Sequence, residues 1–147
     1  MELSAELEAG SGRGSALPRS VLREIGVGVR SVAEAQAREL VRRSGLPLPV
    51  LNPQVYDGTG RFLAMPDAWF DDVALAWQID SVEWHADPVG YRTTLERRSA
   101  LAAAGIVVMH TLPSKLAVNR DEVLAELRAM YRHAWSRPRP NVIAVPA

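Results

Sequence analysis

The chain has 147 residues, 48% of them hydrophobic, which is enough for one compact domain with its own core. The 17 basic and 17 acidic residues cancel, so no overall field favours nucleic acid or a membrane surface, and any basic surface must be local. The lack of cysteine excludes disulfides and thiolate metal sites. No apolar run approaches about 20 residues, so no membrane span is expected.

The first part of the chain, residues 1–30, is predicted to be a flexible leader that contains one short helix. Its first residues are acidic and include no apolar segment, so they do not form a secretory signal, and the cytoplasm is the expected location. The run Gly10–Ser15 is typical of a linker. Pro18–Ile25 predicts the short helix, with Pro18 in its first turn and Gly26 after its last.

A structured domain is predicted over residues 31–136, and it begins with a helix. Ser31 and Glu34 have the spacing of a capping box, in which each side chain bonds the backbone amide of the other. The helix is expected to continue to about Ser44, because Gly45 follows as a stop.

Three strands are then predicted, joined as a meander. Val50–Tyr56 has the composition of a strand, and Pro53 within it indicates an edge position. Asp57–Gly60 reads Asp-Gly-Thr-Gly, a strong hairpin signal, so Arg61–Asp67 is expected to return as the second strand. A polar turn leads into the third strand, Val73–Asp80.

The rest of the chain is organised around this third strand. Bulky, β-favouring residues alternate in it with small and polar ones, as expected for a strand with two different faces. The bulky face carries Val73, Leu75, Trp77 and Ile79, and the other face carries Ala74, Ala76, Gln78 and Asp80. Two small residues followed by two polar ones leave room beside the polar pair, which predicts one wall of a site.

The remaining elements complete an α/β (α+β) fold. We predict a helix at Tyr91–Ala104, a strand covered on both faces at Ile106–Thr111, and a last helix from an Asn119 cap to Trp135. The tail, residues 137–147, is rich in proline and is expected to be extended or disordered. A helix between the third and fourth strands suits a crossover, so we expect a mixed sheet flanked by helices.

Acidic and amide side chains are expected to converge at one end of this sheet. Asp67 ends the second strand, and Gln78 and Asp80 end the third, so antiparallel pairing would bring them close together. Glu34 on the preceding helix could supply a further carboxylate. Carboxylates that converge in a small-walled cleft can hold Mg²⁺ against phosphate oxygens. The spacing alone is not specific, because single acids at strand ends are common.

Two segments of the chain resemble a known family. They are Pro66–His85, P-D-A-W-F-D-D-V-A-L-A-W-Q-I-D-S-V-E-W-H, and Arg92–His110, R-T-T-L-E-R-R-S-A-L-A-A-A-G-I-V-V-M-H. Together with the S-x-x-E opening at Ser31 and Glu34, they resemble the PD-(D/E)XK nuclease superfamily, in particular its uncharacterised domains similar to very-short-patch-repair endonucleases. The resemblance covers about Arg30 to Tyr131. It implies a restriction-endonuclease-like α-β-β-β-α-β core and a metal-dependent phosphodiesterase site for DNA.

The resemblance also implies roles for individual residues. The ligands of Mg²⁺ or Mn²⁺ would be Asp67, Gln78 and Asp80. The residues that orient the attacking water would be His85 or Glu34. The contacts to DNA would come from Arg92, Arg97, Arg98 and Trp84.

The chain departs from the family pattern in its third strand. Gln78 stands where the pattern has glutamate, and Asp80 stands where a lysine would follow. An amide oxygen can bind a metal but brings no charge, so cleavage is expected to be attenuated or absent. The alternative function is a non-catalytic module that binds nucleic acid or protein in a bacterial toxin–antitoxin or defence system. A third interpretation is a small structural domain that forms a homodimer through its edge strand.

Several candidate residues also have a purely structural interpretation. Asp67 could cap the turn near Trp69, and Glu34 could serve only its capping box. His110, inside an apolar strand, is interpreted as a core or sheet-end histidine. The arginines of the predicted helix Tyr91–Ala104 could simply be exposed to water on its surface, an interpretation that the neutral net charge favours.

Overall fold

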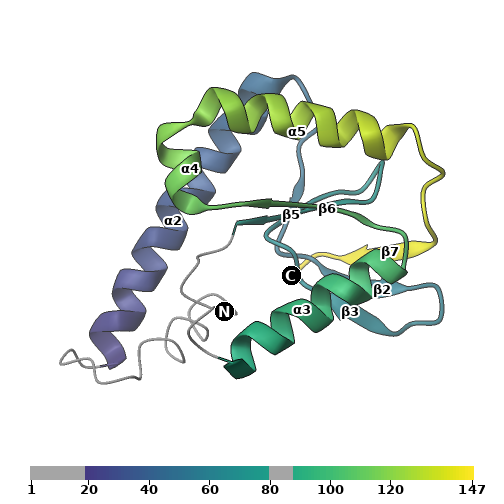
Figure 1. Cartoon of the computed structure of the whole chain (residues 1–147), viewed down its shortest axis with the longest axis horizontal. Helices are drawn as coiled ribbons and strands as arrows, with labels where there is room; N and C mark the ends of the chain where they lie inside the picture. Colours follow the sequence, from purple (N-terminus) through teal and green to yellow (C-terminus); the bar gives the residue numbers. More distant parts are fainter. Residues whose placement is uncertain (1–18, 80–87) are drawn as a thin grey trace.

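The computed structural model describes residues 19–79 and 88–147 (Figure 1). The helices are α2 (Arg19–Ser44), α3 (Pro88–Ala103), α4 (Pro113–Val118) and α5 (Arg120–Trp135). The strands are β1 (Val50–Leu51), β2 (Gln54–Asp57), β3 (Phe62–Ala64), β4 (Ala68–Phe70), β5 (Leu75–Ile79), β6 (Val107–Thr111) and β7 (Val142–Val145). These strands form two sheets, ordered β1-β4-β5-β6 and β3-β2-β7.

The four-stranded sheet is the centre of the fold. β4 runs antiparallel to both β1 and β5, whereas β5 and β6 are parallel and are joined through α3. A parallel pair needs a crossover connection, and a helix is its usual form. The order α2, β1, β4, β5, α3, β6 is the expected α-β-β-β-α-β order, and the mixed sheet flanked by helices confirms the predicted α/β (α+β) fold class.

Both faces of this sheet are covered, with α5 on one side of β5 and β6 and α3 on the other (Figure 1). Leu75 and Trp77 pack on the α5 side in one apolar cluster, as the alternation predicted. Ala76 faces the other cluster, and in the register it lies opposite Trp69 of β4. The space expected beside the small residues is therefore filled by a tryptophan, and that part of the face forms core and not the wall of a site.

The predicted three-strand meander is divided between the two sheets. β2 and β3 pair with each other in the second sheet, whereas β1 and β4 pair in the first. Pro53 and Pro66 stand at the two points where the chain passes between sheets, and proline cannot donate a ladder hydrogen bond. Asn52 at the first of these points has a positive φ of 51°, which bends the chain away from β1. The strand that pairs with β5 is consequently β4, not the predicted Arg61–Asp67.

The hairpin between β2 and β3 was predicted correctly. The Asp57 carboxylate accepts from the backbone amides of Thr59 and Arg61 at 2.9 and 3.0 Å and from the Thr59 hydroxyl at 2.6 Å. These hydrogen bonds, the Thr59 hydroxyl above all, lower the pKa of Asp57 below its usual value, because they stabilise the ionised form. Gly60 has a φ of 88°, a conformation that side chains disfavour.

The first helix is longer than predicted. α2 runs without a break from Arg19 to Ser44, through the glycine at 26 where a stop was expected. Glycine lowers helix stability by roughly 1 kcal/mol but does not by itself end a helix. Ser31 lies inside α2, so the capping box that it was expected to form with Glu34 is wrong. The predicted end is right, and Gly45 there has a φ of 77°.

The start of the last helix also differs from the prediction. Asn119 makes no side-chain cap to α5, and its backbone amide instead donates to the Lys115 carbonyl of α4 at 2.7 Å. Glu122, three residues after Asn119, does not complete a capping box with it: its carboxylate lies 3.1 Å from the Lys115 ammonium. The Asn119 amide and the Glu122 carboxylate therefore both interact with Lys115 of the preceding helix α4, which was not predicted.

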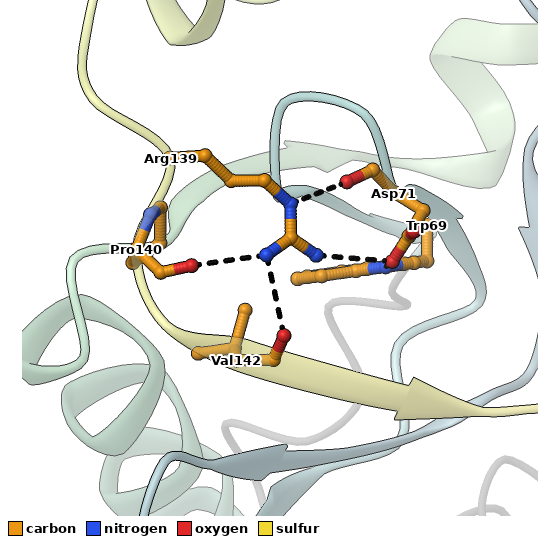
Figure 2. A network of polar contacts seen from close by, with 5 residues as sticks. All are labelled: Trp69, Asp71, Arg139, Pro140 and Val142. Carbon is orange, nitrogen blue, oxygen red and sulfur yellow. Dashed lines mark hydrogen bonds and ion pairs between the residues drawn. The ribbon is translucent and has the colours of Figure 1, made fainter.

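The proline-rich tail is extended and ordered as a strand. β7 pairs with β2, with Val142 opposite Asp57. Arg139 holds the tail to the turn that precedes β5 (Figure 2): its guanidinium donates to the carbonyl and the carboxylate of Asp71 at 2.7 and 3.1 Å. It also donates to the carbonyls of Pro140 and Val142 at 3.1 and 3.3 Å. The Trp69 indole donates to the same Asp71 carboxylate at 2.9 Å, which joins this network to the core.

We expect Arg139→Ala to lower the free energy of unfolding by about 1–2 kcal/mol, because it removes the four hydrogen bonds that Arg139 donates to Asp71, Pro140 and Val142 at a partly exposed site. Urea unfolding followed by far-ultraviolet circular dichroism measures the change. The matched control is Arg137→Ala, two residues earlier, where no side-chain contact is lost. Equal effects of the two substitutions would show that the Arg139 network does not hold the tail.

Candidate functional site

The candidate site lies where the parallel strands β5 and β6 end. Gln78 of β5 is paired in register with His110 of β6, so both side chains belong to the same face and the same edge of the sheet. In open α/β sheets, ligands bind beyond the carboxyl ends of the strands. Both residues are half-buried, as expected at a boundary between core and solvent.

Asp67 lies beside this pair. It comes just before β4, one residue beyond the Ala68–Trp77 pair, which places it next to Gln78. The sequence predicted this proximity with Asp67 at the end of the second strand, whereas the structure has it at the beginning of β4. Its carboxylate Oδ2 accepts from the backbone amide of Ile79 at 2.7 Å. β4 has not yet begun at this position, so the carboxylate supplies the acceptor that a paired strand would otherwise provide. Asp67 therefore has a structural role at the end of β5.

His110 and Arg98 form a contact that the sequence did not reveal. Arg98 Nη2 lies 3.1 Å from His110 Nδ1. A guanidinium can only donate, so Nδ1 must accept, and the imidazole proton resides on Nε2. This histidine was interpreted as a core or sheet-end residue, and it is at the sheet end. Its pairing with Gln78 depends on the parallel register, which no local pattern encodes.

The three arginines of α3 do not form one patch. Arg98 is directed at His110, whereas Arg92 lines a groove of about 690 Å³ between α3 and the β2–β3 hairpin, together with Arg61 and Glu96. Arg97 is half-buried and has a partner. Residues one position apart on a helix point about 100° away from each other, which explains the separation. The predicted DNA-binding set therefore divides into a residue at the candidate site and others along the helix.

The other candidates lie on α2 or outside the described residues. Glu34 is half-buried on α2, next to Ala33, which packs in the apolar cluster on the α5 side of the sheet. The predicted site residues that lie in the segment 80–87, outside the described residues, are Asp80, Trp84 and His85.

The donor chemistry of the described site fits Mg²⁺ in part. Asp67 offers a carboxylate and Gln78 an amide oxygen at neighbouring positions, and Mg²⁺ often takes one or two carboxylates with water and phosphate oxygens around it. Within residues 19–79 and 88–147, no group of three acidic or histidine side chains is arranged to hold a metal. A tight site would thus need Asp80 as well.

No protein-family model matches the chain. No solved structure matches it either. Two curated proteins of Mycobacterium tuberculosis are similar to it: Uncharacterized protein MT2308 of strain CDC 1551 / Oshkosh and Uncharacterized protein Rv2248 of strain H37Rv, each 38% identical over 58 residues. The match covers 40% of this chain and 21% of each relative, so the chain spans about a fifth of the length of the curated relatives it matches.

These similarities assign no activity, because both relatives are named as uncharacterised. A helix that crosses a bilayer must be both long and apolar. None of the helices in residues 19–79 and 88–147 is both long and apolar enough to cross one.

Proposed function

We propose that this is a phosphodiesterase domain of nuclease ancestry that cleaves DNA weakly with Mg²⁺ or Mn²⁺. The observation that supports it most directly is the meeting of the Asp67 carboxylate with the end of β5, where Gln78 pairs with His110. When β2 and β3, which pair in the other sheet, are left aside, the order of the remaining elements from α2 to β6 is compatible with the core that the PD-(D/E)XK resemblance implies. When bound, the ion would supply positive charge against the phosphate oxygens.

Each residue has a defined task in this proposal. Asp67 is the charged ligand of the ion, Gln78 a neutral one, and Asp80 a second carboxylate. Arg98 is close enough to the same edge to hold a phosphate oxygen, and a guanidinium does this with two parallel hydrogen bonds. Further roles follow from the resemblance alone: water orientation by His85 or Glu34, and DNA contacts by Arg92, Arg97 and Trp84.

A non-catalytic module of a toxin–antitoxin or defence system is the second candidate. It is favoured by the hydrogen bond from Ile79 to Asp67, which gives this carboxylate a structural role that needs no metal. It is also favoured by Gln78, which brings no charge to the site. Such a module would bind nucleic acid or a partner protein without cleaving a bond.

Asp67→Asn is the sharpest test of the phosphodiesterase proposal. The amide oxygen of asparagine can still accept from Ile79, so the melting temperature should change by less than about 3 °C. Nicking of supercoiled plasmid DNA in Mn²⁺ should nevertheless fall by at least about 100-fold, since even changes outside the ligand shell of a metal cost about 10- to 100-fold.

The matched control is Asp121→Asn, which removes one negative charge from the exposed start of α5. It should leave nicking unchanged. If the unmodified protein nicks DNA and the Asp67→Asn variant nicks it equally fast, the assignment of this site is refuted. Metal-independent DNA binding without any nicking would instead favour the second candidate.

A further inference from the structure

The C-terminal end of α5 carries an aromatic pair at the surface. The rings of Tyr131 and Trp135 are stacked, with centroids 6.3 Å apart and planes 23° from parallel. Trp135 is 68% exposed, whereas Tyr131 is half-buried. One face of the Trp135 indole lies on Tyr131, so its other face is open to solvent.

The support beneath Trp135 is rigid. The Tyr131 ring meets the buried ring of Phe70 edge to face, with centroids 5.9 Å apart. The Tyr131 hydroxyl donates a hydrogen bond to the carboxylate of Asp72. Burial, followed by this hydrogen bond, raises the pKa of Tyr131 to about 12. The stack is thereby anchored to the end of β4.

Unpaired cations flank the stack. Residues 127–147 contain no acidic residue, and their basic residues other than His133 are Arg128, Arg132, Arg137 and Arg139. Arg128 donates to the carbonyl of Ser44, and Arg139 holds the tail. Arg132 and Arg137 are exposed, and within the part of the chain that the structure describes their side chains make no hydrogen bond or ion pair. The two guanidinium groups are therefore available to a ligand.

Simpler explanations account for only part of this surface. The negative end of the α5 dipole favours Arg132 in the last turn, but Arg137 lies beyond the helix. Single exposed apolar residues are common on protein surfaces, but a tryptophan stacked on an anchored tyrosine has a fixed, usable face. A second copy of this chain docked here about a two-fold axis would place like charges opposite each other, which is unfavourable.

We infer that this platform, formed by Tyr131, Arg132, Trp135 and Arg137, binds single-stranded nucleic acid. An unpaired base would stack on the open face of Trp135, and the arginines would contact the phosphates on either side. Bases in a duplex are already stacked on their neighbours, so a duplex should bind less tightly. The platform packs on Phe70 at the far end of β4 from Asp67, and the end of α5 lies away from the end of β5 (Figure 1). It is therefore separate from the proposed phosphodiesterase site.

Fluorescence anisotropy of a labelled oligothymidine of about 12 nucleotides, a length within the usual single-strand site size, tests the inference. Trp135→Ala should weaken binding by about fivefold or more, because stacking on an aromatic side chain contributes about 1–3 kcal/mol per base. Arg132→Gln and Arg137→Gln should each reduce the slope of log affinity against log salt by about 0.7. A duplex of the same length should bind more weakly than the single strand.

Matched controls separate the platform from general surface effects. Val118→Ala removes an equally exposed apolar side chain from α4, and Arg120→Gln removes a cation from the other end of α5; neither should change binding. With the divalent metal removed by chelation, the phosphodiesterase site cannot hold DNA through an ion, and binding by the platform should persist, so the two proposals can fail independently. Unchanged affinity for the oligothymidine in Trp135→Ala would overturn the inference. Displacement of the labelled oligothymidine by polyglutamate as readily as by unlabelled oligothymidine would also overturn it, and so would a dimer whose formation depends on Trp135.

Discussion

Replacing Gln78 with glutamate is expected to raise the affinity for Mn²⁺ by about tenfold or more, because affinity for hard cations follows the number of charged oxygen ligands. Gln78 is one position beyond the Ala68–Trp77 pair and therefore next to Asp67 in the strand register, so the substitution adds a second carboxylate at that end of β5. Calorimetric titration measures the affinity. Nicking of plasmid DNA in Mn²⁺ should increase in parallel.

Gln78→Glu should also make the melting temperature depend on metal. Two carboxylates side by side repel each other, so without metal the variant should melt at a lower temperature than the unmodified protein. Mn²⁺ should reverse this loss, since a ligand that binds only the folded state stabilises it. Thermal unfolding with and without Mn²⁺ measures both effects.

Gln54→Glu is the matched control, because it adds the same charge to an exposed strand residue of β2. It should gain neither Mn²⁺ affinity nor metal-dependent stability. A Gln78→Glu variant that behaves like this control would show that the end of β5 is not built for a metal ion, and the non-catalytic candidate would then stand alone.

Trp77→Ala is expected to have the largest effect on stability, about 3–5 kcal/mol, because it opens a cavity in the centre of the fold. Trp77 is completely buried between β5 and the helices on the α5 side. Urea unfolding measures the loss as a lower transition midpoint with a similar slope. Trp135→Ala is the matched control: the same change at a 68% exposed position should cost no more than about 0.5 kcal/mol.

The polar edge of Trp77 allows a finer test. Its indole Nε1 donates to the hydroxyl of Thr111 at 2.9 Å, inside the core. Trp77→Phe and Thr111→Val should each cost about 1–3 kcal/mol, because each leaves one buried polar group unpaired. The double variant should cost less than the sum. Strict additivity would mean that this hydrogen bond does not contribute to stability.

Local sequence patterns predicted the elements that are specified by residues a few positions apart, such as β5 and the hairpin between β2 and β3. The alternation in Val73–Asp80 identified β5 and its two faces, because period-two patterning is a property of the strand itself. Asp57–Gly60 identified the hairpin, since the Asp57 side chain and a glycine at positive φ are sufficient to form the turn. The helix that precedes β6 was also evident. Asp67 and Gln78 were expected to be neighbours, but they are so for another reason: Asp67 stands just before β4 and not at the end of the preceding strand, so antiparallel pairing puts it beside the end of β5.

The tertiary structure decided how these elements are assembled. The division of the meander at Pro53 and Pro66, and the recruitment of the tail as β7 beside β2, depend on which strands find a partner elsewhere in the chain. The pairing of Gln78 with His110 depends on how α3, which connects β5 to β6 in the chain, packs against one face of the sheet. Periodicity and turn chemistry act over a few residues, whereas strand partners and register are selected by burial across the whole chain. The sequence alone therefore determined most of the kinds of element, and only the packed structure determined which strands are neighbours and which side chains share the end of β5.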